Sequence, residues 1–170
     1  MFVGEGPGQN EDEQGRPFVG AAGKFLTELL ESIGLKRSDV FITNIVKCRP
    51  PKNRAPRKSE VEACNPYLQL QIRLINPRIV CALGTPAITT LMGDEYSASR
   101  HHGKSLTKGE VTILPMYHPA AALYDASLKE TLFHDFQLLK QMLENTETLN
   151  PSTPKSSEPS GSKQTLEKWA

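Results

Sequence analysis

The stretch MFVGEGPG, residues 1–8, decides the fold, because it runs from a short apolar strand straight into a glycine-rich loop. Its three glycines leave almost no side-chain bulk at the strand end, so a ligand can approach the main chain there. The acids Glu11 and Asp12 come shortly after, and then the stretch GRPFVG at residues 15–20. Phe18 lies in this proline- and glycine-rich stretch, where an aromatic ring indicates that something flat packs on it. The loop therefore predicts a binding site for a planar, polar molecule.

The rest of the chain alternates apolar strands with helices. Strands are predicted at residues 1–3, 39–46, 79–83 and 111–116, and helices at residues 23–32, 59–75, 85–91 and 127–145. Ser59, with Glu62 three residues later, predicts a capping box at the start of the second helix. Strands separated by helical crossovers favour a parallel sheet with helices on both faces. We therefore expect a three-layer α/β/α domain with a central, mostly parallel, four-stranded sheet.

The composition changes near residue 146. Residues 1–145 suffice for one domain with a single core, whereas the Pro- and Ser-rich stretch that follows cannot bury apolar surface and predicts a flexible tether. The last residues include Leu166 and the only tryptophan, Trp169. This spacing would give one helical turn an apolar face, so we expect it to bind a partner protein. An accidental aromatic residue is the alternative.

Charge and cysteine content narrow the class of protein. The formal net charge is +1, so the overall charge does not predict a nucleic-acid binder. A short proline-rich stretch nevertheless concentrates basic residues and predicts a local phosphate-binding patch: Lys47, Arg49, Lys52, Arg54, Arg57 and Lys58. No apolar run reaches the roughly 20 residues of a membrane span. The three cysteines include no close pair, which favours a reducing compartment, so we expect a cytoplasmic protein, and a monomer.

Unusual polar groups follow the predicted strands, at the edge where open α/β sheets bind ligands. The Asn44 amide offers one donor and one acceptor, which complements a pyrimidine edge; capping of the local main chain is the alternative. The His118 imidazole, held by Pro119, can donate to a developing oxyanion; a structural histidine is the alternative. Glu5 and Glu11 can orient or activate a water molecule, or can be solvated loop acids.

In combination these stretches resemble the family 4 uracil-DNA glycosylases, the thermostable iron–sulfur type. The resemblance covers residues 1–145 and rests on four segments: GEGPG at 4–8, GRPFVG at 15–20, NIVKCRPP at 44–51 and HPAA at 118–121. It implies a monofunctional enzyme that flips uracil out of DNA, hydrolyses its N-glycosidic bond and leaves an abasic site for base excision repair. A non-catalytic uracil-DNA binding module and a generic nucleotide-binding domain are the alternatives.

The resemblance also implies roles for individual residues. Phe18 would stack on the uracil ring and Asn44 would bind its edge, while the main chain at Gly6 and Pro7 would hold the base. His118 would stabilise the charge that grows on O2 as the glycosidic bond breaks. The two acids, Glu5 and Glu11, would order the pocket or the attacking water.

DNA would be held by the basic loop and by a wedge, an apolar side chain that enters the duplex. In the loop, we expect the DNA contacts to come from Lys47, Arg49, Lys52, Asn53 and Arg54. Leu123 or Tyr124 would fill the gap that the extruded nucleotide leaves. The alternative is that these two residues simply begin the last helix.

The family binds a [4Fe–4S] cluster through four cysteines. Cys48 and Cys64 match the second pair, and Cys81 lies in a predicted buried strand. The first pair would precede the first strand, so we expect two further ligands to lie upstream in a longer protein, or the cluster to be absent. Residues 163–170 are similar to a sliding-clamp interaction peptide, with Leu166 and Trp169 as its apolar plug.

Overall fold

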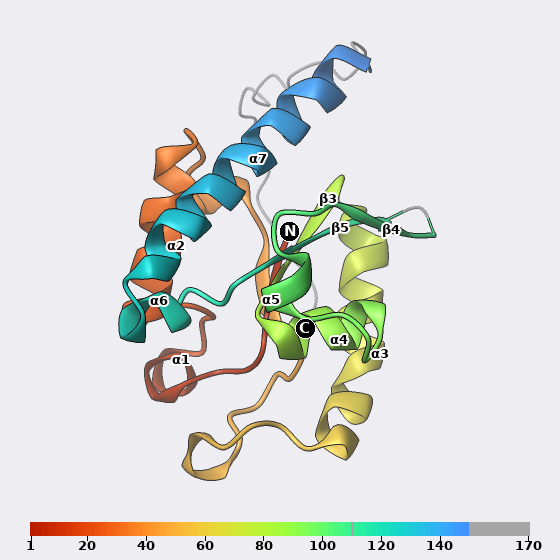
Figure 1. Ribbon diagram of the computed structural model, residues 1–170. Helices are drawn as coiled ribbons and strands as arrows, with labels where there is room; N and C mark the ends of the chain where they lie inside the picture. Colours follow the sequence, from red (N-terminus) through yellow and green to blue (C-terminus); the bar gives the residue numbers. More distant parts are fainter. Residues whose placement is uncertain (110, 150–170) are drawn as a thin grey trace, which may run out of the picture.

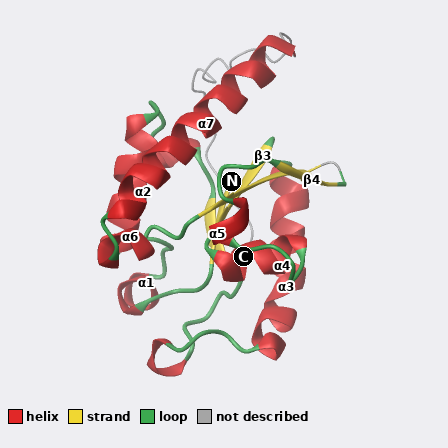
Figure 2. Cartoon of the chain, viewed as in Figure 1, coloured by secondary structure: helices red, strands yellow, loops and turns green. Residues whose placement is uncertain are grey.

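A sheet of five strands lies between two layers of helices in the computed structural model, which describes residues 1–109 and 111–149 (Figures 1 and 2). The strands are β1 (Phe2–Gly4), β2 (Ile42–Asn44), β3 (Ile79–Leu83), β4 (Leu106–Lys108) and β5 (Val111–Met116). The helices are α1 (Gln9–Gln14), α2 (Ala21–Ser32), α3 (Lys58–Ile75), α4 (Thr85–Met92), α5 (Ala98–His101), α6 (Ala121–Tyr124) and α7 (Ser127–Leu149). Two short 3-10 helices are η1 (Arg37–Asp39) and η2 (Pro51–Asn53).

The strand order is β2-β1-β3-β5-β4, and the first four strands are parallel. This confirms the predicted three-layer fold with a mostly parallel sheet. The predicted number of four strands is wrong, because β4 adds an antiparallel edge to β5. Two of the three residues of β4, Thr107 and Lys108, are exposed, so the strand carries no buried apolar run that the sequence could have revealed.

The two faces of the sheet bury two separate clusters of side chains. Phe2, Cys81 and Leu114 pack toward α2 and α7, whereas the neighbouring residues Val3 and Val80 pack toward α3 and α4. The alternation follows from the two-residue repeat of a strand, and both faces are covered because parallel sheets take helices on each side. Cys81 is 1% exposed, which confirms the predicted core position, and burial raises the pKa of its thiol to about 12.

The start of α3 differs from the predicted capping box. The carboxylate of Glu60 accepts a hydrogen bond of 2.8 Å from the main-chain N–H of Arg57, so the acid that caps the helix is Glu60 rather than Glu62. The helix begins one residue before Ser59, the predicted cap. Its end is as predicted, because Asn76 takes a left-handed conformation with φ 45°.

Two other element boundaries differ from the predicted ones. The predicted strand at 39–46 is regular only in β2, since residues 37–39 form η1. Helix α7 runs four residues past the predicted end at 145, and the proposed tail peptide at 163–170 lies outside the described residues. Within residues 1–109 and 111–149, no helix combines the length and the apolar character that crossing a membrane requires.

Candidate active site

Three predicted site residues meet at the carboxyl ends of the strands: Asn44 and Phe18 lie against Gly4, and His118 lies against Phe18 and Gly84. Gly4 pairs in register with Asn44, and a side chain at Gly4 would place its Cβ 2.6 Å from Asn44 Oδ1 and 2.7 Å from the Phe18 ring. Only glycine therefore lets both groups approach this close. The rings of Phe18 and His118 stack on each other, with centroids 5.4 Å apart and an interplanar angle of 26°. The aromatic ring, the amide and the imidazole thus form one cluster.

Asn44 carries an acceptor without a partner. Its side chain is 6% exposed, and its Oδ1 is the buried side-chain oxygen or nitrogen atom among the described residues that lacks a hydrogen bond. A buried acceptor left unpaired costs about 1–3 kcal/mol. Because no described main-chain group pairs with this oxygen, the structure gives no support to the capping alternative. The protein alone therefore leaves this acceptor unpaired.

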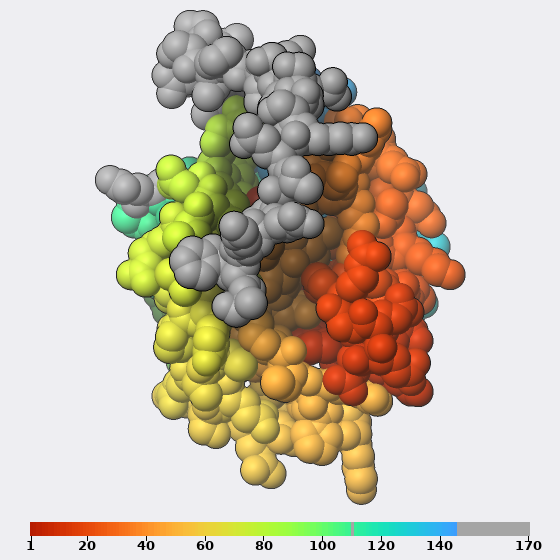
Figure 3. Space-filling view, turned by 180° about the vertical axis from the view of Figure 1, so that it is seen from behind, coloured from red at the N-terminus to blue at the C-terminus, as the bar shows by residue number. Residues whose placement is uncertain are grey.

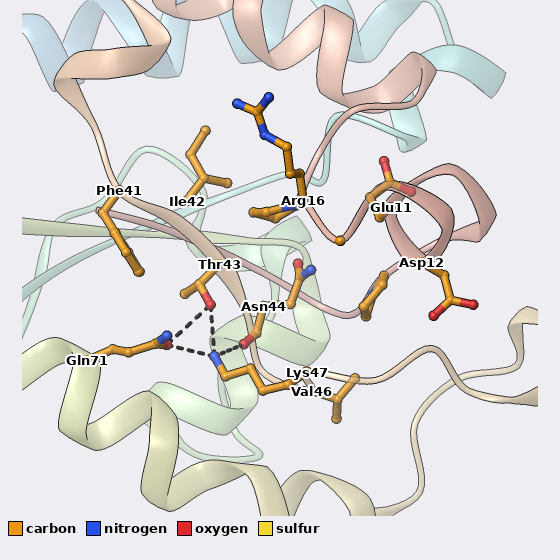
Figure 4. A pocket seen from close by; sticks show the side chains of 13 residues that line it. Glu11, Asp12, Arg16, Phe41, Ile42, Thr43, Asn44, Val46, Lys47 and Gln71 are labelled. Carbon is orange, nitrogen blue, oxygen red and sulfur yellow. Dashed lines mark hydrogen bonds between the residues drawn. The ribbon is translucent and has the colours of Figure 1, made fainter. Parts of the chain in front are cut away.

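A cavity of about 380 Å³ opens beside Asn44 (Figure 4). Cavities of this size hold small organic ligands. Its lining includes residues from the first loop and α1, from β2 and the residues just after it, and from α3: Pro7, Glu11, Asn44, Val46, Lys47 and Gln71. The rings of Phe18 and His118 are not part of this lining. Asn44 therefore joins the ring cluster to the open cavity.

His118 is held as a neutral ring with a defined donor. The main-chain N–H of Ala120 donates to Nδ1 at 3.1 Å, so in the neutral ring the proton lies on Nε2. Burial lowers the pKa of His118 to about 4, and the nearby charge of Glu11 only partly opposes this shift. At neutral pH the imidazole is therefore a hydrogen-bond donor through Nε2, suited to an oxyanion that forms next to it.

The depressed pKa of His118 makes stability depend on pH. The unfolded chain protonates this ring below about 6.5, whereas the folded protein does so only near 4, so stability falls as the pH drops between these values. The full effect is about 3 kcal/mol. We expect urea unfolding of the wild type to lose this amount between pH 7 and 4 relative to His118→Gln, which cannot titrate. Equal pH dependence in both proteins would contradict the assignment.

The two predicted acids have different surroundings. Glu11 Oε1 accepts main-chain hydrogen bonds from Val19 at 2.9 Å and Gly20 at 2.7 Å. Burial acts to raise the pKa of Glu11, but main-chain hydrogen bonds outweigh it, and the net pKa is lowered. Glu11 therefore remains ionised and fixes the loop that carries Phe18.

Glu5 does not join the cavity that Asn44 and Glu11 line. It lines a second cavity of about 470 Å³, together with Ile45 and residues of α3 and α4. Glu5 is thus placed apart from the cavity beside Asn44, and its predicted part in ordering the pocket or the attacking water stays a prediction. Burial raises the pKa of Glu5.

Much of the basic loop between β2 and α3 is engaged within the protein. Arg54 makes a two-pronged contact with Glu60, at 2.8 and 2.6 Å, and Arg49 Nε donates to Asn53 Oδ1 at 2.6 Å. The ammonium group of Lys47, a predicted DNA contact, donates to three acceptors inside the protein (Figure 4). The exposed cations of the loop are Lys52 and Arg57, and Lys58, the first residue of α3, is exposed beside them. Figure 3 shows this loop, in light orange, projecting beside the red N-terminal residues.

The predicted wedge residues are at the surface. Leu123 is 46% exposed and Tyr124 is 92% exposed, and both lie in α6. Because Asp125 and Ala126 separate α6 from α7, these residues do not begin the last helix. Two large exposed apolar side chains next to the His118 loop remain available for a duplex.

Cys48 and Cys64 lie at one cavity of about 230 Å³. The main-chain N–H of Lys47 points at Cys64 Sγ, 3.4 Å away, which is the kind of contact that sulfur ligands of iron clusters accept. These two thiols fit half of a four-thiolate set, and Cys81 is too deeply buried in β3 to add to it. Among the described residues no group of three or more His, Cys, Asp or Glu side chains is placed to hold a metal.

A buried Asp–His pair behind the site was missed by the sequence analysis. Asp135, on α7, is fully buried, and its carboxylate accepts from His102 Nδ1 at 3.1 Å. The His102 ring packs 4.9 Å from the ring of Tyr117, the residue before His118. Asp135 lies between the core residues Leu132 and Phe136. The signal for this pair in the sequence was an acidic residue on the apolar face of the last predicted helix.

Known proteins share this sequence pattern. Residues 1–144 match the family model of the uracil DNA glycosylase superfamily. The chain is 50% identical over 151 residues to a type-4 uracil-DNA glycosylase of Sulfurisphaera tokodaii, covering 84% of this chain and 69% of that protein. It is 47% identical to the type-4 enzymes of Saccharolobus solfataricus and Archaeoglobus fulgidus, covering 84% of this chain and 70% and 75% of those proteins. The chain therefore belongs to the type-4 family of uracil-DNA glycosylases.

Proposed function

We propose that this protein excises uracil from DNA, leaving an abasic site and free uracil for the start of base excision repair. The observation that carries the proposal is the buried, unpartnered Oδ1 of Asn44, which lies in one cluster with Phe18 and His118. The type-4 names of its relatives agree with this reading.

Asn44 reads the uracil edge in this proposal. Uracil N3–H donates to Asn44 Oδ1, and uracil O4 accepts from the Asn44 amide N–H. The Phe18 ring supplies a stacking surface, and the main chain at Gly6 and Pro7 borders the base. Glu11 holds the loop in place through its bonds to Val19 and Gly20.

His118 supports the bond cleavage. As the bond between C1′ and uracil N1 breaks, its electron pair passes to uracil and negative charge grows on O2. The neutral His118 ring donates a hydrogen bond to O2 through Nε2. Water adds its oxygen to C1′, and the proton released restores neutral uracil. The contacts of Lys47 agree with hydrolysis without a lyase step. Its ammonium group donates to three acceptors inside the protein, so it is not free to form the Schiff base that a lyase step needs.

DNA binding must offset the cost of extruding the base, which is a few kcal/mol. We assign phosphate contacts to the exposed cations of the loop, among them Lys52, with Arg49, Asn53 and Arg54 shaping it. Leu123 or Tyr124 enters the duplex where the nucleotide leaves. Cys48 and Cys64 would supply two thiolates of a [4Fe–4S] cluster, whose contribution when bound is to cross-link this loop.

The test is a duplex oligonucleotide with a single U·G mismatch, incubated with the protein and then treated with alkali. We expect strand breaks at the uracil and release of free uracil, and no breaks in a matched duplex with T in place of U. Tight binding without breaks would reduce the protein to a uracil-DNA binding module. If the protein neither binds the duplex nor produces breaks in it, the proposal is contradicted altogether.

We also propose that the glycosylase domain, predicted to end at residue 145 and extended by α7 to Leu149, belongs to a cytoplasmic monomer. The tail that follows it binds a sliding clamp through Leu166 and Trp169. Deleting residues 161–170 should abolish clamp binding, measured by surface plasmon resonance, and leave excision on short oligonucleotides unchanged. Clamp affinity that survives the deletion would show that the tail assignment is wrong.

A further inference from the structure

We infer that Lys47 is a positioning residue for uracil recognition, which holds the end of β2 so that Asn44 faces the base. The inference rests on the proposed function. It gives Lys47 a role other than the phosphate contact that its place in a basic loop predicts.

The contacts of the Lys47 ammonium carry the inference. Nζ donates to Thr43 Oγ1 at 2.8 Å, to the main-chain oxygen of Asn44 at 2.8 Å and to Gln71 Oε1 at 2.7 Å (Figure 4). A lysine ammonium has three donors and no acceptor. All three are used inside the protein, so none is left for a phosphate oxygen.

These acceptors join two elements that border the cavity. Thr43 and Asn44 are the last two residues of β2, and Gln71 lies on α3. β2 is a three-residue strand at the edge of the sheet, with β1 as its neighbour on one side. Lys47 therefore ties the free side of this short strand to a long helix.

Asn44 needs such a support because its side-chain oxygen has no partner of its own. With Oδ1 unpaired, the direction of the amide depends on how firmly the main chain of Asn44 is held. Lys47 bonds directly to that main chain. A displacement of about 1 Å at a recognition group can cost about 100-fold in rate.

Lys47 is itself fixed at both ends. Its main-chain N–H points at Cys64 Sγ on α3, while its Nζ reaches Gln71 on the same helix. The side chain is partly buried, and its ammonium group donates to three acceptors. A residue held in this way is suited to transmit rigidity from α3 to β2.

Lys47→Met tests the inference, with Lys47→Gln as a milder variant that keeps an N–H donor. We expect Lys47→Met to lower the single-turnover excision rate on uracil DNA about 10- to 100-fold, with a smaller loss for Lys47→Gln. Its affinity for a duplex carrying a tetrahydrofuran abasic analogue should change less than about twofold. The exposed Lys24 on α2 provides the matched control, and Lys24→Met should behave as the wild type.

Salt dependence separates positioning from phosphate binding. A lost phosphate contact lowers the slope of log affinity against log salt by about 1. We expect this change for the exposed Lys52→Met and an unchanged slope for Lys47→Met. A reduced slope in Lys47→Met would overturn the inference, as would an unchanged excision rate.

A double-mutant cycle with Asn44→Ala shows whether Lys47 acts through Asn44. If it does, Lys47→Met or Lys47→Gln should cost little further rate once the amide is gone. Additive losses would indicate a general weakening of the fold and would overturn the inference; thermal unfolding of each variant identifies those that fold. If the wild type itself makes no alkali-labile sites, the proposed function fails. Normal excision by the Lys47 variants is a different result, which overturns only the inference about Lys47.

Discussion

His118→Ala is expected to lower the rate of uracil excision about 100- to 1000-fold, because it removes a donor aimed at charge that develops only as the bond breaks. The donor is preorganised: the Ala120 N–H fixes Nδ1 as the acceptor, and burial lowers the pKa of the ring to about 4, so it stays neutral. Single-turnover kinetics at neutral pH measure the loss. Affinity for a duplex with an abasic analogue should remain within about twofold, since His118 makes no phosphate contact in this account.

His134 provides the control for this variant. Its side chain is 72% exposed on α7, so His134→Ala should excise uracil at the wild-type rate. An excision rate of His118→Ala within a few fold of the wild type would contradict the assigned role. A loss of affinity equal to the loss of rate would place His118 in DNA binding instead.

Asn44→Asp is expected to lower excision of uracil about 100-fold and to narrow the preference for uracil over cytosine. A carboxylate cannot donate to uracil O4, and two like-charged oxygens would face each other. The lost hydrogen bond and the repulsion together amount to about 3 kcal/mol, which corresponds to this change in rate. Cytosine presents an amino donor at the same place, so the carboxylate does not disfavour it in the same way.

Asn65→Asp on α3 is the matched control, because an aspartate there still accepts the hydrogen bond from Gln69. Its rate and base preference should equal those of the wild type. Unchanged activity and base preference in a folded Asn44→Asp protein would remove Asn44 from the recognition of uracil. Thermal unfolding shows whether the buried carboxylate is tolerated at all.

The meeting of Phe18, Asn44 and His118 could be predicted because it depends on topology. The carboxyl ends of parallel neighbouring strands lie at one edge of a sheet, so residues far apart in sequence come together there. The glycine at position 4 added the clearance that the amide and the ring both use. Sequence pattern was sufficient for this part of the site.

The direction of individual side chains could not be predicted in the same way. Glu5 is one residue after Gly4, and successive residues of an extended chain point to opposite sides, which takes its carboxylate to another cavity. Lys47 stands in a basic stretch, but its reach to Gln71 depends on how α3 packs against β2. The pairing of Arg54 was not apparent from the basic stretch, because its partner, Glu60, lies just after that stretch.

The decisive experiment is a crystal structure of the protein with free uracil. We expect uracil N3 within hydrogen-bond distance of Asn44 Oδ1, the uracil ring against Phe18 and uracil O2 at His118 Nε2. Uracil bound at another place, with Asn44 Oδ1 still unpaired, would contradict this expectation.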